Sequence, residues 1–309
     1  MKLVFMGTPQ FSVPILEALL EHHEVLLVVT QPDKPVGRKK IMTESPIKKL
    51  ALSHQIPVFQ PLKLKTDYQR VLDTKPDIII TAAYGQMLPK ELINRVEAIN
   101  VHGSLLPQYR GGAPIQYALF DGQEETGITI MFMAYQMDSG DIIKQERVKI
   151  ENKDNYASLS HKLSIVGSKL IIHVLNHYDK NKIKRIPQDV NKVTFAYTLK
   201  RHDEFLNFKQ TTKAVVNRIR GLAPEPGAHA YLGNQIIKFY GAVNSDIIDS
   251  EATPGTILEN KKRLIIATLD GSVEILEIQA PGKKQMAVKD FLNGQNIIRI
   301  GDIFIEGNE

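Results

Sequence analysis

Two polar side chains that could act together in catalysis lie two residues apart near the middle of the chain. Asn100 and His102 end a short apolar run, and Gly103 then opens a loop rich in Gly and Pro that reaches Pro114. Alternate side chains of a strand point to the same face, so the amide and the imidazole converge at the end of this predicted strand. A lone His is more often structural, but an Asn partner and such a loop make His102 a catalytic candidate.

A carboxylate that could complete the pair lies in the segment Met137 to Asp141, a predicted tight turn between two strands. Amide and imidazole groups can donate hydrogen bonds to the oxyanion of a tetrahedral intermediate, and a carboxylate can orient the imidazole and move protons from an attacking amine. Asn100, His102 and Asp138 therefore suit acyl transfer to an amine. Ser104 is not expected to be a nucleophile, because its surroundings lack the G-x-S-x-G elbow.

The elements around these residues predict an α/β fold with a largely parallel sheet, because buried-strand patterns alternate with helical ones. In such sheets ligands bind beyond the carboxyl ends of the strands. The turn after the first strand, Gly7-Thr8-Pro9-Gln10, is not G-x-G-x-x-G, so no dinucleotide cofactor is expected. The predicted strands are 2–6, 24–30, 77–83, 98–102, 127–133 and 142–150, and the predicted helices are 12–22, one that begins at Pro46, and 155–178.

A second domain is predicted after a charged, Pro-interrupted linker that begins at about residue 179. A helical segment over 209–222 precedes short strands punctuated by Gly, a pattern typical of a small β-barrel. We therefore predict a catalytic domain over residues 1–206, which includes a basic loop at 31–45 and the linker, and a barrel domain over 207–309.

Composition excludes several classes of protein. The chain has 309 residues, 43% of them hydrophobic, and no apolar run of the length that a membrane span needs. The apolar stretch at the N-terminus is too short for a secretion signal, so a cytoplasmic protein is expected. The absence of cysteine rules out disulfides, thiolate metal sites and a thiol nucleophile. No metal site and no obligate protein partner are predicted.

The net charge of +5 is unevenly distributed, because the excess of Lys and Arg lies before residue 201. One basic cluster occupies 31–50 and another 179–201. Such clusters are either solvated loops or a surface that binds phosphate groups, and the charge pattern alone leaves both interpretations open.

Residues 100–114, with the Ser-Leu-Leu-Pro tetrapeptide, and 137–143 together resemble the formyltransferases that use 10-formyltetrahydrofolate. The resemblance implies a Rossmann-like, mostly parallel sheet and a C-terminal oligonucleotide-binding-type barrel. It implies that Asn100, His102 and Asp138 are catalytic and that 10-formyltetrahydrofolate is the co-substrate. The folate contacts that it implies, largely through backbone groups, are Tyr84, Gly85, Gln86, Met87, Leu88, Ser104, Leu105, Leu106, Pro107 and Asp138.

Segments 5–11, 30–40, 281–286 and 290–294 resemble those of family members that formylate the α-amino group of methionine on initiator tRNA. The resemblance therefore implies methionyl initiator tRNA as the partner. The implied tRNA contacts are Lys34, Arg38, Lys39, Lys40, Lys182, Lys184 and Arg185. The chain departs from the family at 223–228, where a Trp-containing motif is expected and Ala-Pro-Glu-Pro-Gly-Ala stands instead.

Two other functions remain to be distinguished. A formyltransferase that acts on a small amine, such as a nucleotide or nucleotide sugar, would need neither the barrel nor the basic loop. A nucleic-acid-binding protein without catalytic activity would carry the charge pattern but would not need Asn100, His102 and Asp138 together.

Overall fold

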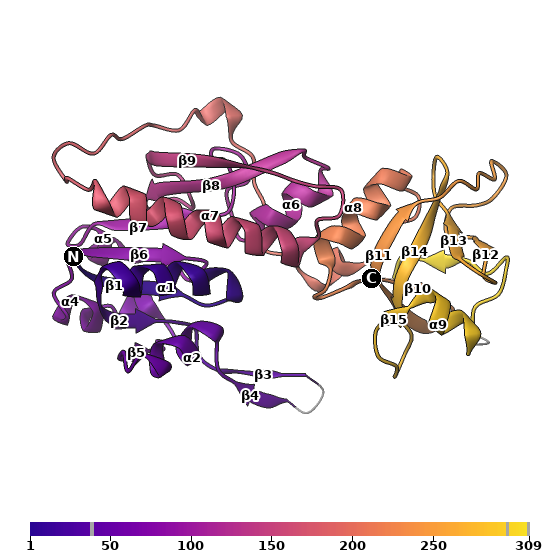
Figure 1. The fold of residues 1–309 in the computed structure, drawn as a ribbon, viewed down its shortest axis with the longest axis horizontal. Helices are drawn as coiled ribbons and strands as arrows, with labels where there is room; N and C mark the ends of the chain where they lie inside the picture. The colour runs from indigo at the N-terminus through magenta and orange to yellow at the C-terminus, as the bar shows by residue number, and fades with distance from the viewer. Residues whose placement is uncertain (38–39, 295–296, 308–309) are drawn as a thin grey trace. The chain divides into compact units, whose positions relative to one another are not determined.

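The structure is a computed structural model that describes residues 1–37, 40–294 and 297–307 (Figure 1). It divides into two compact units. The first comprises Met1–Pro114, Glu125–Lys149 and Ser160–Tyr197, and the second comprises Ile115–Glu124, Ile150–Leu159 and Thr198–Glu309. The domain boundary at residue 206 stays a prediction.

A seven-stranded sheet forms the centre of the first unit, in the order β5-β2-β1-β6-β7-β8-β9. The strands from β5 to β7 are parallel, and β8 and β9 are antiparallel to their neighbours. This arrangement confirms the predicted α/β class with a mostly parallel sheet. The strands are β1 (Lys2–Gly7), β2 (Glu24–Val29), β5 (Val58–Phe59), β6 (Ile78–Ala82), β7 (Ala98–His102), β8 (Glu125–Phe132) and β9 (Ile142–Lys149).

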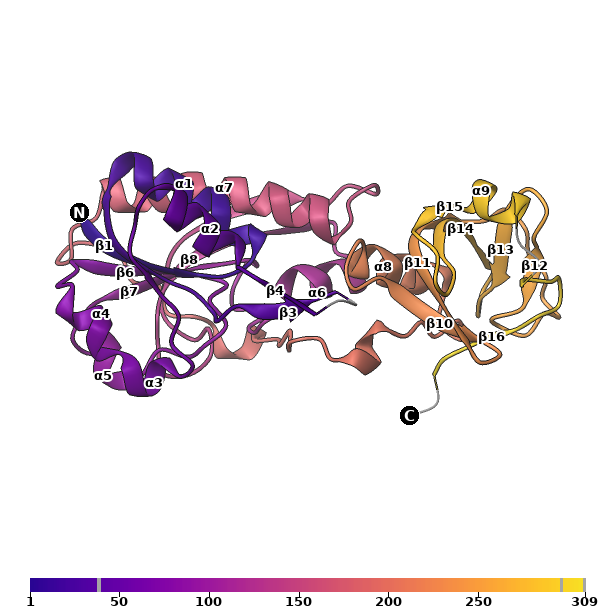
Figure 2. The ribbon, with the colours of Figure 1, turned by 90° about the horizontal axis from the view of Figure 1, so that it is seen from below.

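Helices cover both faces of this sheet: α1, α2 and α7 lie on one face, and α3, α4 and α5 on the other (Figure 2). Gly167 allows α7 to approach the sheet, because a Cβ atom there would lie 3.0 Å from Cγ1 of Val101 on β7. These helices are α1 (Val13–His22), α2 (Pro46–Ser53), α3 (Leu64–Asp67), α4 (Gln69–Asp73), α5 (Lys90–Ile93) and α7 (Tyr156–Asn176), and a 3-10 turn, η1 (Gln10–Ser12), precedes α1. Helix α6 (Pro114–Phe120) falls almost entirely in the second unit.

The basic segment before α2 was predicted as a loop, and this prediction is wrong. Residues Lys34–Val36 (β3) and Ile41–Thr43 (β4) pair as an antiparallel hairpin. The Lys40 amide donates to the Gly37 carbonyl at 3.1 Å. Strands of three residues are too short to show an alternating pattern, and a proline within one of them weakens the signal further.

The second unit contains an antiparallel sheet in the order β12-β13-β14-β11-β10-β16. An antiparallel bridge between Thr256 and Ile303 joins its two edges and closes a barrel-like sheet, which confirms the predicted fold class. Phe208, Phe239 and Phe304 fill its core, with the rings of Phe239 and Phe304 edge to face at 5.3 Å. Its strands are β10 (Ala228–Leu232), β11 (Gln235–Asn244), β12 (Ile257–Glu259), β13 (Leu264–Ala267), β14 (Ser272–Gln279), β15 (Met286–Ala287) and β16 (Phe304–Ile305), and its helices are α8 (Thr212–Leu222) and α9 (Val288–Asn293).

Two properties of the described residues bear on function. No helix among them combines the length and apolar character that crossing a membrane would require. Within the same residues, His, Asp and Glu side chains do not gather in groups of three or more that could hold a metal ion.

Candidate active site

Asn100 and His102 lie at the carboxyl end of β7, where the fold class predicts a ligand site. The hydroxyl of Thr81, on the neighbouring strand β6, donates to Asn100 Oδ1 at 2.8 Å. This hydrogen bond turns the amide oxygen toward β6 and leaves the NH₂ group of Asn100 as the end that can donate to an oxyanion. Thr81 was not identified from the sequence, because a Thr inside a buried strand carries no functional signal.

The imidazole of His102 is 5% exposed, and its Nε2 lies 3.0 Å from the carbonyl oxygen of Tyr109. A carbonyl oxygen only accepts hydrogen bonds, so Nε2 carries the proton in the neutral ring. Nδ1 is therefore the atom that faces the site. It lies 3.7 Å from Asp138 Oδ2, where the carboxylate can pair with a protonated imidazole.

Asp138 is held in an unusual backbone conformation, with φ at 49°. Its Oδ2 accepts a hydrogen bond of 2.8 Å from the backbone amide of Gly111. Gly140 lets the same turn pass close to β8, because a Cβ atom there would lie 1.8 Å from the carbonyl oxygen of Phe132. The structure therefore brings together the three residues predicted to be catalytic.

Gln188 and Arg110 form a clamp behind this turn. The guanidinium of Arg110, 8% exposed, donates from Nε and Nη2 to Gln188 Oε1 at 3.0 and 2.7 Å. The amide nitrogen of Gln188 donates to the carbonyl oxygens of Asp138 and Gly140, both at 2.8 Å. Burial lowers the pKa of Arg110, and the nearby Asp138 partly offsets this. Gln188 lies in the charged linker, where the sequence contains no pattern that would have identified it.

Part of the predicted linker is bound to the loop that follows β7. Thr194 accepts hydrogen bonds of 2.9 Å from Tyr109 and Arg110, and Ala196 exchanges backbone hydrogen bonds with Arg110 and Ala113. Gly111 is required at this crossing, since a Cβ atom there would lie 2.3 Å from the carbonyl oxygen of Ala196. The linker therefore supports the site as well as connecting the two units.

The turn after β6 contains the first group of predicted folate contacts. The side chains of Tyr84 and Leu88 are buried in the core of the unit, whereas Gly85 and Met87 are exposed. Burial raises the pKa of Tyr84, whose hydroxyl has no hydrogen-bond partner among the described residues. Gln86 accepts from the amide of Leu64 at 2.8 Å, so its side chain supports the turn. The turn thus offers mainly backbone groups and the Met87 side chain to a ligand.

The second group of predicted folate contacts lies in the loop after β7. The Ser104 hydroxyl donates to the carbonyl of Gln108 at 2.6 Å and is fully buried. Leu106 packs in a small buried cluster with Met131 and Ile142. The amide of Leu106 also donates to the Thr129 hydroxyl at 3.0 Å. These contacts fix the loop and give Ser104 a structural role.

The residues predicted to bind tRNA do not form one patch. Lys34 and Lys40 are exposed on the β3–β4 hairpin, and Arg38 and Lys39 lie outside the described residues. The segment after α7 lies at the opposite end of the first unit from this hairpin (Figures 1 and 2). There, Lys182 pairs with Asp179, Lys184 is exposed, and Arg185 pairs with Glu97 and stacks 3.6 Å over the ring of Phe132.

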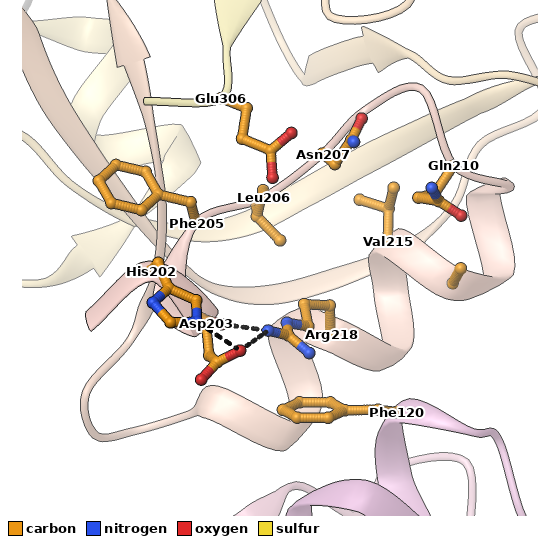
Figure 3. A pocket seen from close by; sticks show the side chains of 11 residues that line it. Phe120, His202, Asp203, Phe205, Leu206, Asn207, Gln210, Val215, Arg218 and Glu306 are labelled. Carbon is orange, nitrogen blue, oxygen red and sulfur yellow. Dashed lines mark hydrogen bonds and ion pairs between the residues drawn. The ribbon is translucent and has the colours of Figure 1, made fainter. Parts of the chain in front are cut away.

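The second unit contains a pocket of its own, with a volume of 420 Å³ (Figure 3). Arg218 lies 4.1 Å from the ring centroid of Phe120, donates to the carbonyl oxygen of Asp203 and pairs with its carboxylate at 3.8 Å. Burial lowers the pKa of Arg218, and Asp203 partly offsets this. The carboxylate of Asp203 already balances the charge of Arg218, so the described residues that line this pocket offer no unpaired positive charge that would favour an anionic ligand.

The geometry at the end of β7 therefore supplies the groups for acyl transfer. The Asn100 amide can donate to a developing oxyanion, as can Nδ1 of His102 when the imidazole is protonated, and the Asp138 carboxylate lies beside His102 as a proton acceptor. All three are held by contacts from neighbouring strands and loops, as a preorganised site requires.

Comparison with known proteins agrees with this chemistry. Residues 1–175 match the family described as Formyl transferase, and residues 198–296 match Formyl transferase, C-terminal domain. A methionyl-tRNA formyltransferase of Staphylococcus epidermidis is 46% identical over 98% of this chain and 99% of that protein. A methionyl-tRNA formyltransferase of Lactobacillus acidophilus is 47% identical over 99% of this chain and 98% of that protein.

Solved structures share the fold at lower identity. HypX from Aquifex aeolicus, in complex with tetrahydrofolic acid, matches with a TM-score of 0.66 and 17% identity over 94% of this chain and 47% of its own length. WlaRD, a sugar 3N-formyl transferase, matches with a TM-score of 0.67 and 19% identity over 92% of this chain and 99% of its own. Because the family model covers more than half of the chain and the two bacterial relatives are similar almost end to end, the chain belongs to the formyl transferase family.

Proposed function

We propose that this enzyme transfers the formyl group of 10-formyltetrahydrofolate to the α-amino group of methionine carried on initiator tRNA. The observation that carries the proposal is the grouping of Asn100, His102 and Asp138 at the end of β7, in a chain whose relatives at 46% and 47% identity are methionyl-tRNA formyltransferases. The reaction takes place in the cytoplasm and needs no obligate protein partner.

In the first step the amine attacks the formyl carbon, a C–N bond forms, and the carbonyl electrons move to the oxygen. The Asn100 amide and Nδ1–H of a protonated His102 donate to this oxyanion. Nε2 of His102 is already engaged with the Tyr109 carbonyl, so the ring donates to the substrate through Nδ1. Asp138 holds the imidazolium and accepts the proton that the amine loses. Collapse of the intermediate then re-forms the carbonyl and breaks the bond to the folate nitrogen, which receives the proton that Asp138 took from the amine.

Binding of the formyl donor involves the exposed turn at residues 84–88, the loop at 104–107, and Asp138. The exposure of Gly85 and Met87 in the first turn supports this assignment, because exposed backbone groups can pair with the polar edge of a pterin ring. Binding of tRNA involves the basic residues of the hairpin and of the segment after α7. Lys34, Lys40 and Lys184 are exposed there and can approach phosphates. Lys182 is also exposed but pairs with Asp179, and Arg185 pairs with Glu97, so a phosphate would have to compete with these carboxylates.

A substrate comparison tests the proposal. The purified protein is given 10-formyltetrahydrofolate together with methionyl initiator tRNA, methionyl elongator tRNA, free methionine or an amino-sugar nucleotide. Formylation of the initiator tRNA alone is expected. Transfer to the amino-sugar nucleotide alone would replace the proposed acceptor with a small amine, and binding of tRNA without consumption of the formyl donor would contradict an enzymatic function.

A further inference from the structure

Two aromatic side chains form an exposed stack on the segment that supports the active site. The rings of Phe195 and Tyr197 lie 5.6 Å apart between centroids with an angle of 4° between their planes. Phe195 is 46% exposed and Tyr197 is 60% exposed, whereas Ala196 between them is fully buried. This alternation is that of an extended segment, with one small residue turned into the protein and two rings turned outward.

The arrangement is unusual for a surface, because large apolar rings in contact with water are unfavourable. The two rings already lie parallel, so a further flat ring can stack on them with little additional ordering. Parallel aromatic side chains on an extended backbone are the means by which proteins hold unpaired bases, since every base has an apolar face.

The stack is coupled to the reaction centre through short connections. Phe195 bridges to Arg110 in the loop after β7, and the hydroxyl of Thr194 accepts a hydrogen bond from the amide of Tyr109 at 2.9 Å. The carbonyl oxygen of that same Tyr109 binds Nε2 of His102 at 3.0 Å. A nucleotide stacked on these rings would therefore be held by a segment that is hydrogen-bonded to the loop contacting His102.

We propose that Phe195 and Tyr197 are a stacking platform for the unpaired bases at the acceptor end of the tRNA. The proposal rests on the proposed function and assigns to these residues a contact with bases, distinct from the contacts that the basic residues make with phosphates. The bases at the acceptor end adjoin the aminoacyl group, which must reach Asn100, His102 and Asp138. The platform therefore positions the substrate beside the site.

Kinetics separate this role from a purely structural one. Phe195→Leu and Tyr197→Leu keep apolar bulk and remove the flat ring, so each is expected to raise KM for methionyl initiator tRNA about tenfold with little change in kcat. This factor corresponds to about 1.4 kcal/mol, within the range for one base stacked on one aromatic ring. Phe195→Tyr and Tyr197→Phe keep an aromatic ring, so KM for methionyl initiator tRNA should stay close to the wild-type value. Tyr135 is another exposed aromatic residue, and its hydroxyl donates a hydrogen bond to Asn94. Tyr135→Leu is therefore the matched control, and it should leave KM for tRNA unchanged.

Salt gives a second criterion. Contacts with phosphates weaken as ionic strength rises, whereas the increase in KM caused by loss of a stacking ring should persist at high salt. An increase in KM for 10-formyltetrahydrofolate, with KM for tRNA unchanged, would mean that the rings contact the folate and would overturn the proposal.

A binding assay makes the result independent of catalysis. The probe is an RNA hairpin with a short unpaired 3′ end whose last base is the fluorescent 2-aminopurine. The full-length protein is added to it and, because it has no Trp, contributes no Trp fluorescence to the signal. Quenching of the probe by the wild type and its loss in both Leu variants, with thermal unfolding unchanged, would support the platform. Equal quenching by wild type and variants would refute it, even if the wild type formylates methionyl initiator tRNA. If the wild type quenches the probe but does not formylate this tRNA, the proposed function fails and the platform stands.

Discussion

Replacement of Gln188 tests whether the clamp behind Asp138 is needed for catalysis. In Gln188→Leu the side chain keeps its approximate size but loses four hydrogen bonds, two from the Arg110 guanidinium and two to the carbonyls of Asp138 and Gly140. A hydrogen bond to a charged group contributes about 1.5–3 kcal/mol and a neutral one about 1 kcal/mol. Water can reach the half-buried Gln188 position, so these values do not add fully, and we expect a loss of about 2–3 kcal/mol in the free energy of unfolding.

The catalytic effect follows from the position of the carboxylate. With the clamp removed, the Asp138 turn keeps the hydrogen bond from Gly111 to Oδ2, and Ile142 at its end still exchanges backbone hydrogen bonds with Ile186 of the linker. It loses the two hydrogen bonds from Gln188 to the carbonyls of Asp138 and Gly140. A displacement of about 1 Å at a reacting group can lower the rate about a hundredfold. Because the contacts from Gly111 and Ile186 remain, kcat is expected to fall between about tenfold and a hundredfold, with KM for tRNA little changed.

A second variant separates the two halves of the clamp. Gln188→Glu can still accept from Arg110 but cannot donate to the carbonyls of Asp138 and Gly140. It should therefore regain much of the stability and keep the low kcat. The assay is single-turnover formylation of methionyl initiator tRNA beside thermal unfolding of each variant. A wild-type kcat in both variants would show that the turn is held without Gln188 and would refute the reasoning.

Three further predictions concern the other parts of the molecule. His102→Ala should lower kcat for formylation at least about a hundredfold, the scale of losing one oxyanion donor, and near-normal turnover would remove His102 from the mechanism. Arg38→Ala should raise KM for tRNA in low salt, with an effect that shrinks as salt is added, and a defect confined to folate use would mean that the basic loop is misassigned. Burial lowers the pKa of His229, opposed by the Gly227 carbonyl and Glu204 and reinforced by Lys238 and Arg201. The folded state therefore favours the neutral ring, and thermal stability should decline as pH falls below about 6.5. His229→Phe should flatten that decline, and an unchanged pH dependence in this variant would assign it to other groups.

Much of the fold was predictable because its signals are local. The apolar runs that became β1, β2, β6 and β7 are short and bounded by turns, and the start of α2 was marked by Ser45 and Pro46. The Ser45 side chain indeed accepts from the amide of Lys48 at 3.0 Å, as an N-cap residue does. The β3–β4 hairpin was missed because each strand has only three residues.

The three proposed catalytic residues were also accessible from the sequence, since Asn100 and His102 are separated by the period of a strand and Asp138 lies in a turn between strands. Their supports were not. Gln188 reaches Asp138 across 50 residues of sequence, and Thr194 reaches Tyr109 across 85. No periodicity encodes contacts of this kind, because they depend on how the sheet and the linker come together in three dimensions.

Gly111 illustrates how such a contact changes the meaning of a residue. In the sequence, Gly111 belongs to a Gly- and Pro-rich loop, and the pattern indicates only that a turn there favours glycine. In the structure its φ is 130°, and the space for a side chain is occupied by the carbonyl of Ala196. The same residue donates its amide to Asp138. The glycine therefore lets the linker pass close enough to hold the loop, and the loop in turn holds the carboxylate, so the position of Asp138 depends on a segment that the sequence marks only as a charged connection.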